Sequence, residues 1–178
     1  YGGLFAPTER DFQDGHRFFT GESVNTGAGT AHILGEEASR ALILLDVKDK
    51  PVREALERAT KTFTAAIQLR ERKQGIFCCG MCSVAMWRHL AAGGLCDQRR
   101  LLKLGMQVLR ERRDGKGKWW KFPFYYTLLA LTEIDTPAAR AELRYAAPVC
   151  ERLLKRPKRQ GDYDLRRRTL LERAMARA

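Results

Sequence analysis

The sequence predicts an all-α fold of stacked helical hairpins, and three observations carry this prediction. Apolar residues recur at helical spacing through most of the 178 residues. Residues that cap, start or end helices, such as Thr, Asp, Pro and Gly, separate these runs. The alternation of apolar and polar residues that is typical of strands is never sustained. The chain therefore reads as a series of helices joined by short turns.

The mostly apolar helices repeat at a nearly constant interval. GEEASRALILLDV begins at Gly35, GMCSVAMWRHLAA at Gly80 and PFYYTLLALTEID at Pro123, so the intervals are 45 and 43 residues. A longer, charged and amphipathic helix follows each of them. Because such a pair cannot bury its apolar surface alone, the pairs must stack side by side. We expect about three hairpins followed by a C-terminal helix.

Three segments follow from this organisation. Residues 1–29 are rich in Gly and Thr and show no sustained period, so we expect an irregular segment there. Residues 30–156 form the hairpin domain, and residues 157–178 form a basic C-terminal helix that packs on or extends the same domain. The helices expected in the hairpin domain span 30–49, 51–74, 81–92, 98–113, 123–134 and 137–156.

Individual residues set several of these ends. The hydroxyl of Thr30 is expected to cap the first helix. Gly75 is expected to end the second helix. Thr136 precedes the proline that begins the sixth helix, and either Asp162 or Asp164 is expected to cap the last one.

The composition limits the class of protein. A chain of this length with 44% hydrophobic residues is large enough for one domain with its own core. The five cysteines are odd in number and include the adjacent pair Cys78-Cys79, which favours a reducing compartment over a disulfide framework. No apolar run approaches the ~20 residues of a transmembrane helix, so no membrane span is expected. We therefore expect a cytoplasmic protein.

The net charge of +12 is concentrated in two blocks. Asp97–Lys121 carries 9 basic against 3 acidic side chains, and Glu151–Ala178 carries 10 against 4. Cations mixed with exposed aromatic residues are typical of single-stranded nucleic-acid platforms. The alternative is that these charges form solvated faces at the ends of hairpins. The candidate polyanion-binding residues are Arg112, Arg113, Lys116, Lys118, Trp120, Lys121, Arg166, Arg167 and Arg168.

One segment resembles a known family. It is LLKLGMQVLRERRDGKGKWWKFPFYYTLLALTEI, in which a helix ends in a D-G-x-G-x-W segment and an aromatic-led Y-T-L-x-x-L helix follows. This is similar to the repeats of the prenyltransferase and squalene/terpene-cyclase superfamily, the α/α-toroid proteins. The resemblance covers about residues 35–156 and implies a partial barrel or an arc, with Trp119 as a packing anchor. The residues that carry it are Asp114, Gly115, Gly117, Trp119, Tyr126, Thr127, Leu128 and Leu131.

The chain departs from that family in its catalytic motifs. The string Asp162-Tyr163-Asp164-Leu165 lacks the final carboxylate of the D-x-D-D motif and lies outside the repeats. A D-D-x-x-D cluster for diphosphate is absent from the sequence, and the zinc ligands of protein prenyltransferases cannot be placed. The resemblance therefore implies a fold more than an activity.

The aromatic residues of the apolar helices are candidates for a ligand cavity. Trp87, Phe124, Tyr125 and Tyr126 fall on helices that would face the concave side, where aromatic residues line the pocket of toroid cyclases. The alternative is that these rings fill the core, as aromatic residues at helical spacing commonly do.

The cysteines suggest a metal site. Cys79-x-x-Cys82 has the spacing of a chelating pair, and Cys78 adjoins it. His89 and Cys96 are excluded because seven helical residues separate Cys82 from His89 by about 10.5 Å, while zinc ligands converge within ~2.3 Å of the ion. Two alternatives stay open, namely cysteines as small packing residues and a reactive thiol at a helix N-terminus.

These observations favour a non-catalytic protein that binds an apolar ligand or a protein partner on its concave face. A nucleic-acid-binding helical repeat and an enzyme acting on an isoprenoid-like substrate are the alternatives. No cofactor is expected apart from zinc as the alternative at the cysteines, and self-association is compatible with the repeat architecture.

Overall fold

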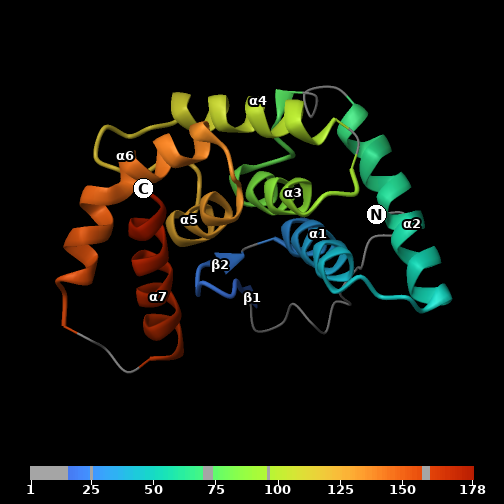
Figure 1. The fold of residues 1–178 in the computed structure, drawn as a ribbon, viewed down its shortest axis with the longest axis horizontal. Coiled ribbons are helices and arrows are strands. Elements are labelled where there is room, and N and C mark those ends of the chain that lie inside the picture. Colours follow the sequence, from blue (N-terminus) through green and yellow to red (C-terminus); the bar gives the residue numbers. More distant parts are fainter. Residues whose placement is uncertain (1–15, 25, 70–73, 96, 158–160) are drawn as a thin grey trace.

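The chain folds into seven α-helices and one two-stranded sheet over residues 16–24, 26–69, 74–95, 97–157 and 161–178, the part that the computed structural model describes (Figure 1). The sheet pairs β1 (His16–Arg17) with β2 (Ser23–Val24) in antiparallel orientation. The predicted all-α class is confirmed. The helices are α1 (Gly27–Leu45), α2 (Lys50–Gln68), α3 (Gly80–Ala92), α4 (Gln98–Glu111), α5 (Phe124–Glu133), α6 (Pro137–Leu154) and α7 (Asp162–Arg177).

The helices are arranged in two rows. α3 packs between α1 and α5, and α5 packs against α7, so these four helices form a central row. α2, α4 and α6 lie around the outside of this row, each in contact with the helix that precedes it in the chain (Figure 1). The pairs α1–α2, α3–α4 and α5–α6 are three helical hairpins, and α7 packs against both helices of the last one.

The core lies between the two rows. It contains side chains with no exposed surface from both the central and the outer helices. Burying one large apolar side chain contributes about 1.5–3 kcal/mol, so these residues hold the rows together. Among the described helices, none combines the length and the apolar character that crossing a membrane requires. The fully buried residues include Phe63 of α2, Trp87 of α3, Leu109 of α4 and Leu128 of α5.

The first helix begins earlier than predicted. α1 starts at Gly27 because the hydroxyl of Thr26 accepts the backbone N–H of Gly29 at 3.0 Å and so acts as the N-cap. Thr30, the predicted cap, lies inside the helix, and its hydroxyl donates to the carbonyl of Thr26 at 3.1 Å. Both threonines are suitable caps, so residue type alone does not distinguish them.

Two other predicted ends also differ. α2 ends at Gln68 rather than near residue 74, because Leu69 adopts an extended backbone. At the start of α7 the capping position is Gly161, and neither predicted aspartate caps the helix. Asp162 and Asp164 lie instead in the first turn, where their negative charges favour the positive end of the helix dipole.

The segment expected to be irregular contains the β1–β2 hairpin, which packs on α5. Phe18 stacks on the ring of Tyr126 with 4.3 Å between centroids. The carboxylate of Glu22 accepts the backbone N–H groups of Tyr125 at 2.8 Å and Tyr126 at 3.0 Å, and so caps the N-terminus of α5. Strands of two residues are too short to show alternation, so pattern analysis missed this hairpin.

The turn between α4 and α5 is built as predicted around Trp119. Gly115 and Gly117 have φ angles of 76° and 89°, which side chains other than glycine rarely adopt. A carboxylate oxygen of Asp114 accepts the backbone N–H groups of two turn residues at 2.8 and 2.9 Å. Trp119 is buried, and its indole N–H donates to Glu142 of α6 at 2.9 Å. The turn thus fastens α4 and α5 to the outer helix α6.

Candidate functional site

A cavity of about 500 Å³ opens between the β1–β2 hairpin and three helices of the central row. Its apolar walls come from the hairpin, from α1 and from α5, and its polar end comes from α1, α3 and α5. This volume lies in the range of small-molecule pockets, which are mostly apolar with a few placed polar groups. The apolar lining residues are Phe18, Phe19, Val24, Ile33, Leu34 and Leu129, the polar end consists of Glu37, Arg88, Tyr126 and Glu133, and His16, Arg17 and Thr30 also line the cavity.

Charged side chains form a connected network at the polar end. Arg88 donates to both carboxylate oxygens of Glu133, at 2.8 and 3.0 Å, and also to Glu37. Arg40 forms an ion pair with Glu133 at 2.9 Å. The hydroxyl of Tyr126 donates to Glu37. Two arginines therefore face two carboxylates, and the network is balanced in charge.

Burial changes the acid–base properties of this network. It raises the pKa of Tyr126 well above the usual value, and the negative charge of Glu37 raises it further, so the phenol stays protonated. Burial alone would lower the pKa of Arg88. The hydrogen bond to Glu133 and the charge of Glu37 outweigh burial and raise that pKa. Arg88 is therefore a permanent cation that is already neutralised by its neighbours.

A second pair of side chains also connects α1 and α3, but it lies in the core. Glu36 and His89 are fully buried, and the Nδ1 atom of His89 lies 2.6 Å from a carboxylate oxygen of Glu36. They adjoin Glu37 and Arg88 in the sequence. Consecutive residues of α1 therefore pair with consecutive residues of α3, Glu36 with His89 and Glu37 with Arg88. Glu36 and His89 are not among the residues that line the cavity. A group without exposed surface cannot touch a ligand, so this pair has a structural role.

The structure separates the four aromatic residues that were candidates for one cavity. Only Tyr126 lines the cavity between the hairpin and the central row. Trp87 is fully buried and donates its indole N–H to the carbonyl of Gly75 at 2.6 Å. Phe124 packs near Trp119, and Tyr125 lines a different groove, next to α7. Phe18 and Phe19, which the cavity uses instead, were missed because they lie in the segment without a sustained period.

The candidate polyanion-binding residues fall into an exposed set and an engaged set. Arg112, Lys116, Lys118 and Lys121 are exposed, and Trp120 is 65% exposed beside them. Arg113 turns inward and forms an ion pair with Glu142 at 2.8 Å. The arginines of α7 contact other parts of the chain: Arg166 lies over the ring of Phe19, Arg167 donates to the carbonyl of Thr20, and Arg168 donates to that of Leu154.

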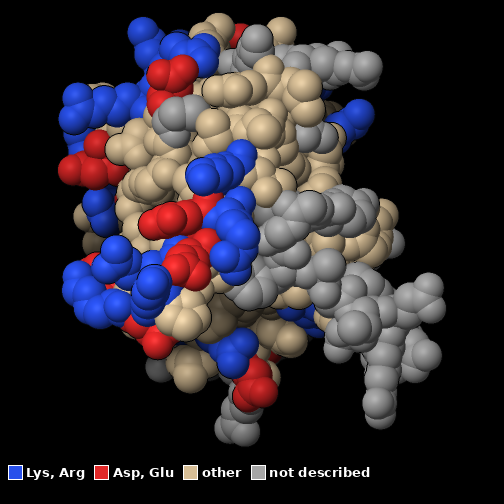
Figure 2. All heavy atoms as spheres, turned by 90° about the vertical axis from the view of Figure 1, so that its right-hand side faces the viewer, with Lys and Arg blue, Asp and Glu red and all other residues tan. Residues whose placement is uncertain are grey.

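Charge on another face is mixed rather than uniformly basic. Figure 2 shows the side of the molecule that carries α2, where Lys and Arg side chains alternate with Asp and Glu. This matches the near balance of basic and acidic residues in the first half of the sequence. The α2 side is therefore not a candidate basic surface, and the candidates remain those of the α4–α5 turn and of α7.

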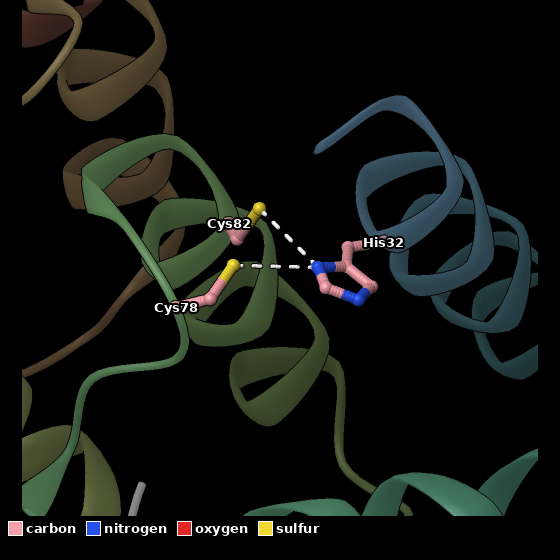
Figure 3. Close-up of side chains that lie close together, drawn as sticks. All are labelled: His32, Cys78 and Cys82. Carbon is pink, nitrogen blue, oxygen red and sulfur yellow. Dashed lines mark hydrogen bonds between the residues drawn. The ribbon is translucent and has the colours of Figure 1, made fainter. Parts of the chain in front are cut away.

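A cysteine–histidine cluster lies at the N-terminus of α3, next to α1 (Figure 3). The Nδ1 atom of His32 is 3.3 Å from the sulfur of Cys78 and 3.7 Å from the sulfur of Cys82. The three ligand atoms all lie within 4.8 Å of one another. The chain thus presents a possible His/Cys/Cys metal site. Two of its members were predicted, whereas His32 lies far away in the sequence and was not.

The third predicted cysteine has a different role in this cluster. Cys79 is the N-cap of α3, and its sulfur accepts the backbone N–H of Cys82 at 3.5 Å. Hydrogen bonds from the thiols of Cys78 and Cys82 hold the pKa of Cys79 well below its usual value. His89 belongs to the pair with Glu36, in agreement with its exclusion as a ligand, and Cys96 lies outside the described residues.

Comparison of the chain with models of protein families, with curated proteins and with solved structures found no match. The similarity to prenyltransferase and cyclase repeats stays a prediction that rests on the motif of the α4–α5 turn. The cavity and the cysteine–histidine cluster are the features of the chain that bear on its function.

Proposed function

We propose that the protein binds a small, mostly apolar molecule with a neutral hydrogen-bonding group in the cavity between the β1–β2 hairpin and the central helices. The observation that carries this proposal is the mostly apolar lining of the cavity together with the hydrogen-bonded polar group of Glu37, Arg88, Tyr126 and Glu133. Small-molecule sites commonly combine an apolar enclosure with a few polar groups that fix orientation.

The charge balance of the polar end favours a neutral ligand group. Arg88 and Arg40 are already paired with Glu37 and Glu133. An anionic group would have to compete with these carboxylates for the arginines, and a cationic group would meet Arg88, which lines the cavity. A hydroxyl or amide can instead donate to Glu37 without breaking an ion pair. An alcohol with an apolar body, including an isoprenoid-like one, fits this requirement.

The residues of the chain favour ligand binding without catalysis. The chain lacks the D-x-D-D and D-D-x-x-D motifs with which the resembled enzymes act. The Glu36–His89 pair has no exposed surface and so cannot reach a bound molecule. The resemblance of the α4–α5 turn to cyclase repeats supports an apolar ligand on the inner side, because that family lines its pocket with inner helices.

Leu34 and Leu44 provide a matched pair of variants that tests the proposal. Both leucines lie on α1 and are 45% and 58% exposed, but only Leu34 lines the cavity. We expect Leu34→Lys to weaken binding of the neutral apolar dye Nile red by about tenfold, since ~1.4 kcal/mol of apolar contact is lost. Leu44→Lys should leave the affinity unchanged.

Fluorescence titration of Nile red measures both affinities. Mass spectrometry of an organic extract from the native protein identifies what co-purifies. Equal dye affinities of the two variants, together with no co-purifying apolar molecule, would show that the cavity is not a ligand site.

Polyanion binding at the α4–α5 turn is a second candidate. It is favoured by Trp120, whose large exposed ring belongs to the same turn as the exposed Lys116, Lys118 and Lys121. Retention on heparin should fall steeply with salt and should decrease in Trp120→Ala. Elution of the tag-free protein at low salt regardless of this substitution would exclude the candidate.

A further inference from the structure

We infer that His32, Cys78 and Cys82 bind one zinc ion that fastens α1 to the N-terminus of α3, independently of any ligand in the cavity. The three residues come from α1, from the loop before α3 and from the first turn of α3 (Figure 3). Two thiolates and one imidazole are ligands that zinc prefers, and two thiolates neutralise its charge.

The distances agree with a shared ion. A tetrahedral zinc with a Zn–S bond of about 2.3 Å and a Zn–N bond of about 2.05 Å separates sulfur from nitrogen by about 3.6 Å. The two sulfur-to-Nδ1 distances are 3.3 and 3.7 Å, on either side of this value. Only small side-chain movements are needed to place all three atoms around one ion.

The convergence on a single nitrogen also favours a metal over two thiol hydrogen bonds. Nδ1 of an imidazole carries either one lone pair or one hydrogen, so it cannot form good hydrogen bonds with two sulfurs at once. Cys78 and Cys82 nevertheless approach the same Nδ1 atom of His32. A zinc ion instead accepts the lone pair of Nδ1 and those of two thiolates at the same time.

Neighbouring contacts hold the cluster in place. The hydroxyl of Ser83 accepts the backbone N–H of Phe77 at 2.9 Å and donates to the carbonyl of Cys79 at 2.6 Å, which fixes the loop that carries Cys78. The ring of Phe77 packs edge-on against the imidazole of His32, with 4.9 Å between centroids. Such outer contacts orient metal ligands before the ion binds.

Cys79 stays outside the ligand set. Among the described residues, the ligand atoms that converge are those of His32, Cys78 and Cys82, whereas the sulfur of Cys79 accepts the N–H of Cys82 and caps α3. The zinc site therefore has three protein ligands, and since Cys78 is exposed, water would supply the fourth. A Cys79–Cys82 disulfide is the competing outcome, because this spacing at a helix N-terminus is also that of redox dithiols.

The first test is the metal content of the full chain, purified under reducing conditions without a histidine tag from zinc-supplemented cells. About one zinc per chain is expected. Cobalt substitution should give thiolate-to-cobalt charge transfer and the visible absorption of tetrahedral coordination. Less than about a tenth of an equivalent of zinc, or a Cys79–Cys82 disulfide with no metal, overturns the proposal.

Variants then assign the ligands. His32→Gln and Cys82→Ser should each weaken zinc affinity by more than about 100-fold, which exceeds the usual effect of losing an outer-shell contact. Cys79→Ser preserves the helix cap and Cys150→Ala changes a buried cysteine of α6, so both should bind zinc normally. If Cys82→Ser fails to fold, His32→Gln and the cobalt spectrum of the unmodified chain still decide.

Two results would contradict the assignment. Normal zinc affinity in His32→Gln would remove the histidine from the site. Loss of zinc in Cys79→Ser to the same extent as in Cys82→Ser would overturn the three-ligand set.

Discussion

Two glutamates are buried in the described part of the chain, and their surroundings differ. Glu142 of α6 accepts three hydrogen bonds, two from Arg113 at 3.0 and 2.8 Å and one from the indole of Trp119 at 2.9 Å. Among the described residues, the side chain of Glu36 of α1 forms one hydrogen bond, with Nδ1 of His89 at 2.6 Å. Within the described part of the chain, the other oxygen of Glu36 and Nε2 of His89 have no hydrogen-bond partner.

Because of this difference, the carboxylate of Glu142 stabilises the fold, whereas burying the carboxylate of Glu36 costs free energy that its hydrogen bond does not offset. A buried charge that is paired and fully hydrogen-bonded can offset its desolvation, whereas a partly satisfied one cannot. In agreement, burial raises the pKa of Glu36 despite the hydrogen bond from His89. The Glu142 region therefore fixes the α4–α5 turn, while the Glu36–His89 contact leaves two buried polar atoms without a hydrogen bond in the described part of the chain and stabilises the fold less.

The largest effect that tests this comparison comes from Trp119. Trp119→Ala removes a buried aromatic ring and one donor to Glu142, and we expect a loss of about 3–5 kcal/mol in the free energy of unfolding. Trp120→Ala, at the exposed neighbouring position, should change it by less than about 0.5 kcal/mol. Urea unfolding followed by circular dichroism measures both. Similar values for the two variants would remove Trp119 as the anchor of the turn.

A smaller effect separates the two glutamates directly. Glu142→Gln keeps the shape but removes the charge, and should lower stability by about 1.5–3 kcal/mol, the range for hydrogen bonds to charged groups. The loss stays below that of a fully buried pair because the side chain of Arg113 is 30% exposed and can reach water. Glu36→Gln should lower stability by less than about 1 kcal/mol at pH 7, because its charge is already disfavoured by burial. Urea unfolding of the two variants in parallel measures the difference, and a larger loss for Glu36→Gln would reverse the comparison.

The α4–α5 turn and the α1–α3 contact also differ in how far they could be predicted from the sequence. The α4–α5 turn was predicted because its signals are local: two glycines, an aspartate and a tryptophan within a few residues. The cap of α6 was also predicted, from Thr136 followed by proline, and the hydroxyl of Thr136 accepts the N–H of Ala139 at 3.2 Å. Helical periodicity likewise predicted the all-α class, because it reports on burial along each helix.

The α1–α3 contact could not be predicted in this way. His32 lies 46 residues from Cys78 in the sequence, and Glu36 lies 53 from His89. Periodicity indicates which face of a helix is buried, but it does not say which other helix covers that face. Cys78 and Cys82 were therefore recognised as possible ligands without their histidine. The cavity depends on the same packing and on a hairpin too short to be recognised.

The smallest expected effect is the pH dependence that Glu36 contributes. Its folded-state pKa is raised above the usual 4.5, so the folded protein holds this proton more tightly than the unfolded chain. The stability from this group is fully present below pH 4.5 and is lost as pH rises through the raised pKa. The free energy of unfolding of the unmodified protein should therefore fall relative to Glu36→Gln as pH increases.

Groups that titrate in both proteins, including Glu22, cancel in this difference. His89 of α3 and Glu37 of α1 both lie next to the carboxylate of Glu36. The pH at which the difference in unfolding free energy begins to change therefore shows which group titrates. Urea unfolding of both proteins from pH 4 to 8 tests this, and a difference that is constant, or that changes only around the ~6.5 of an imidazole, would assign the effect elsewhere.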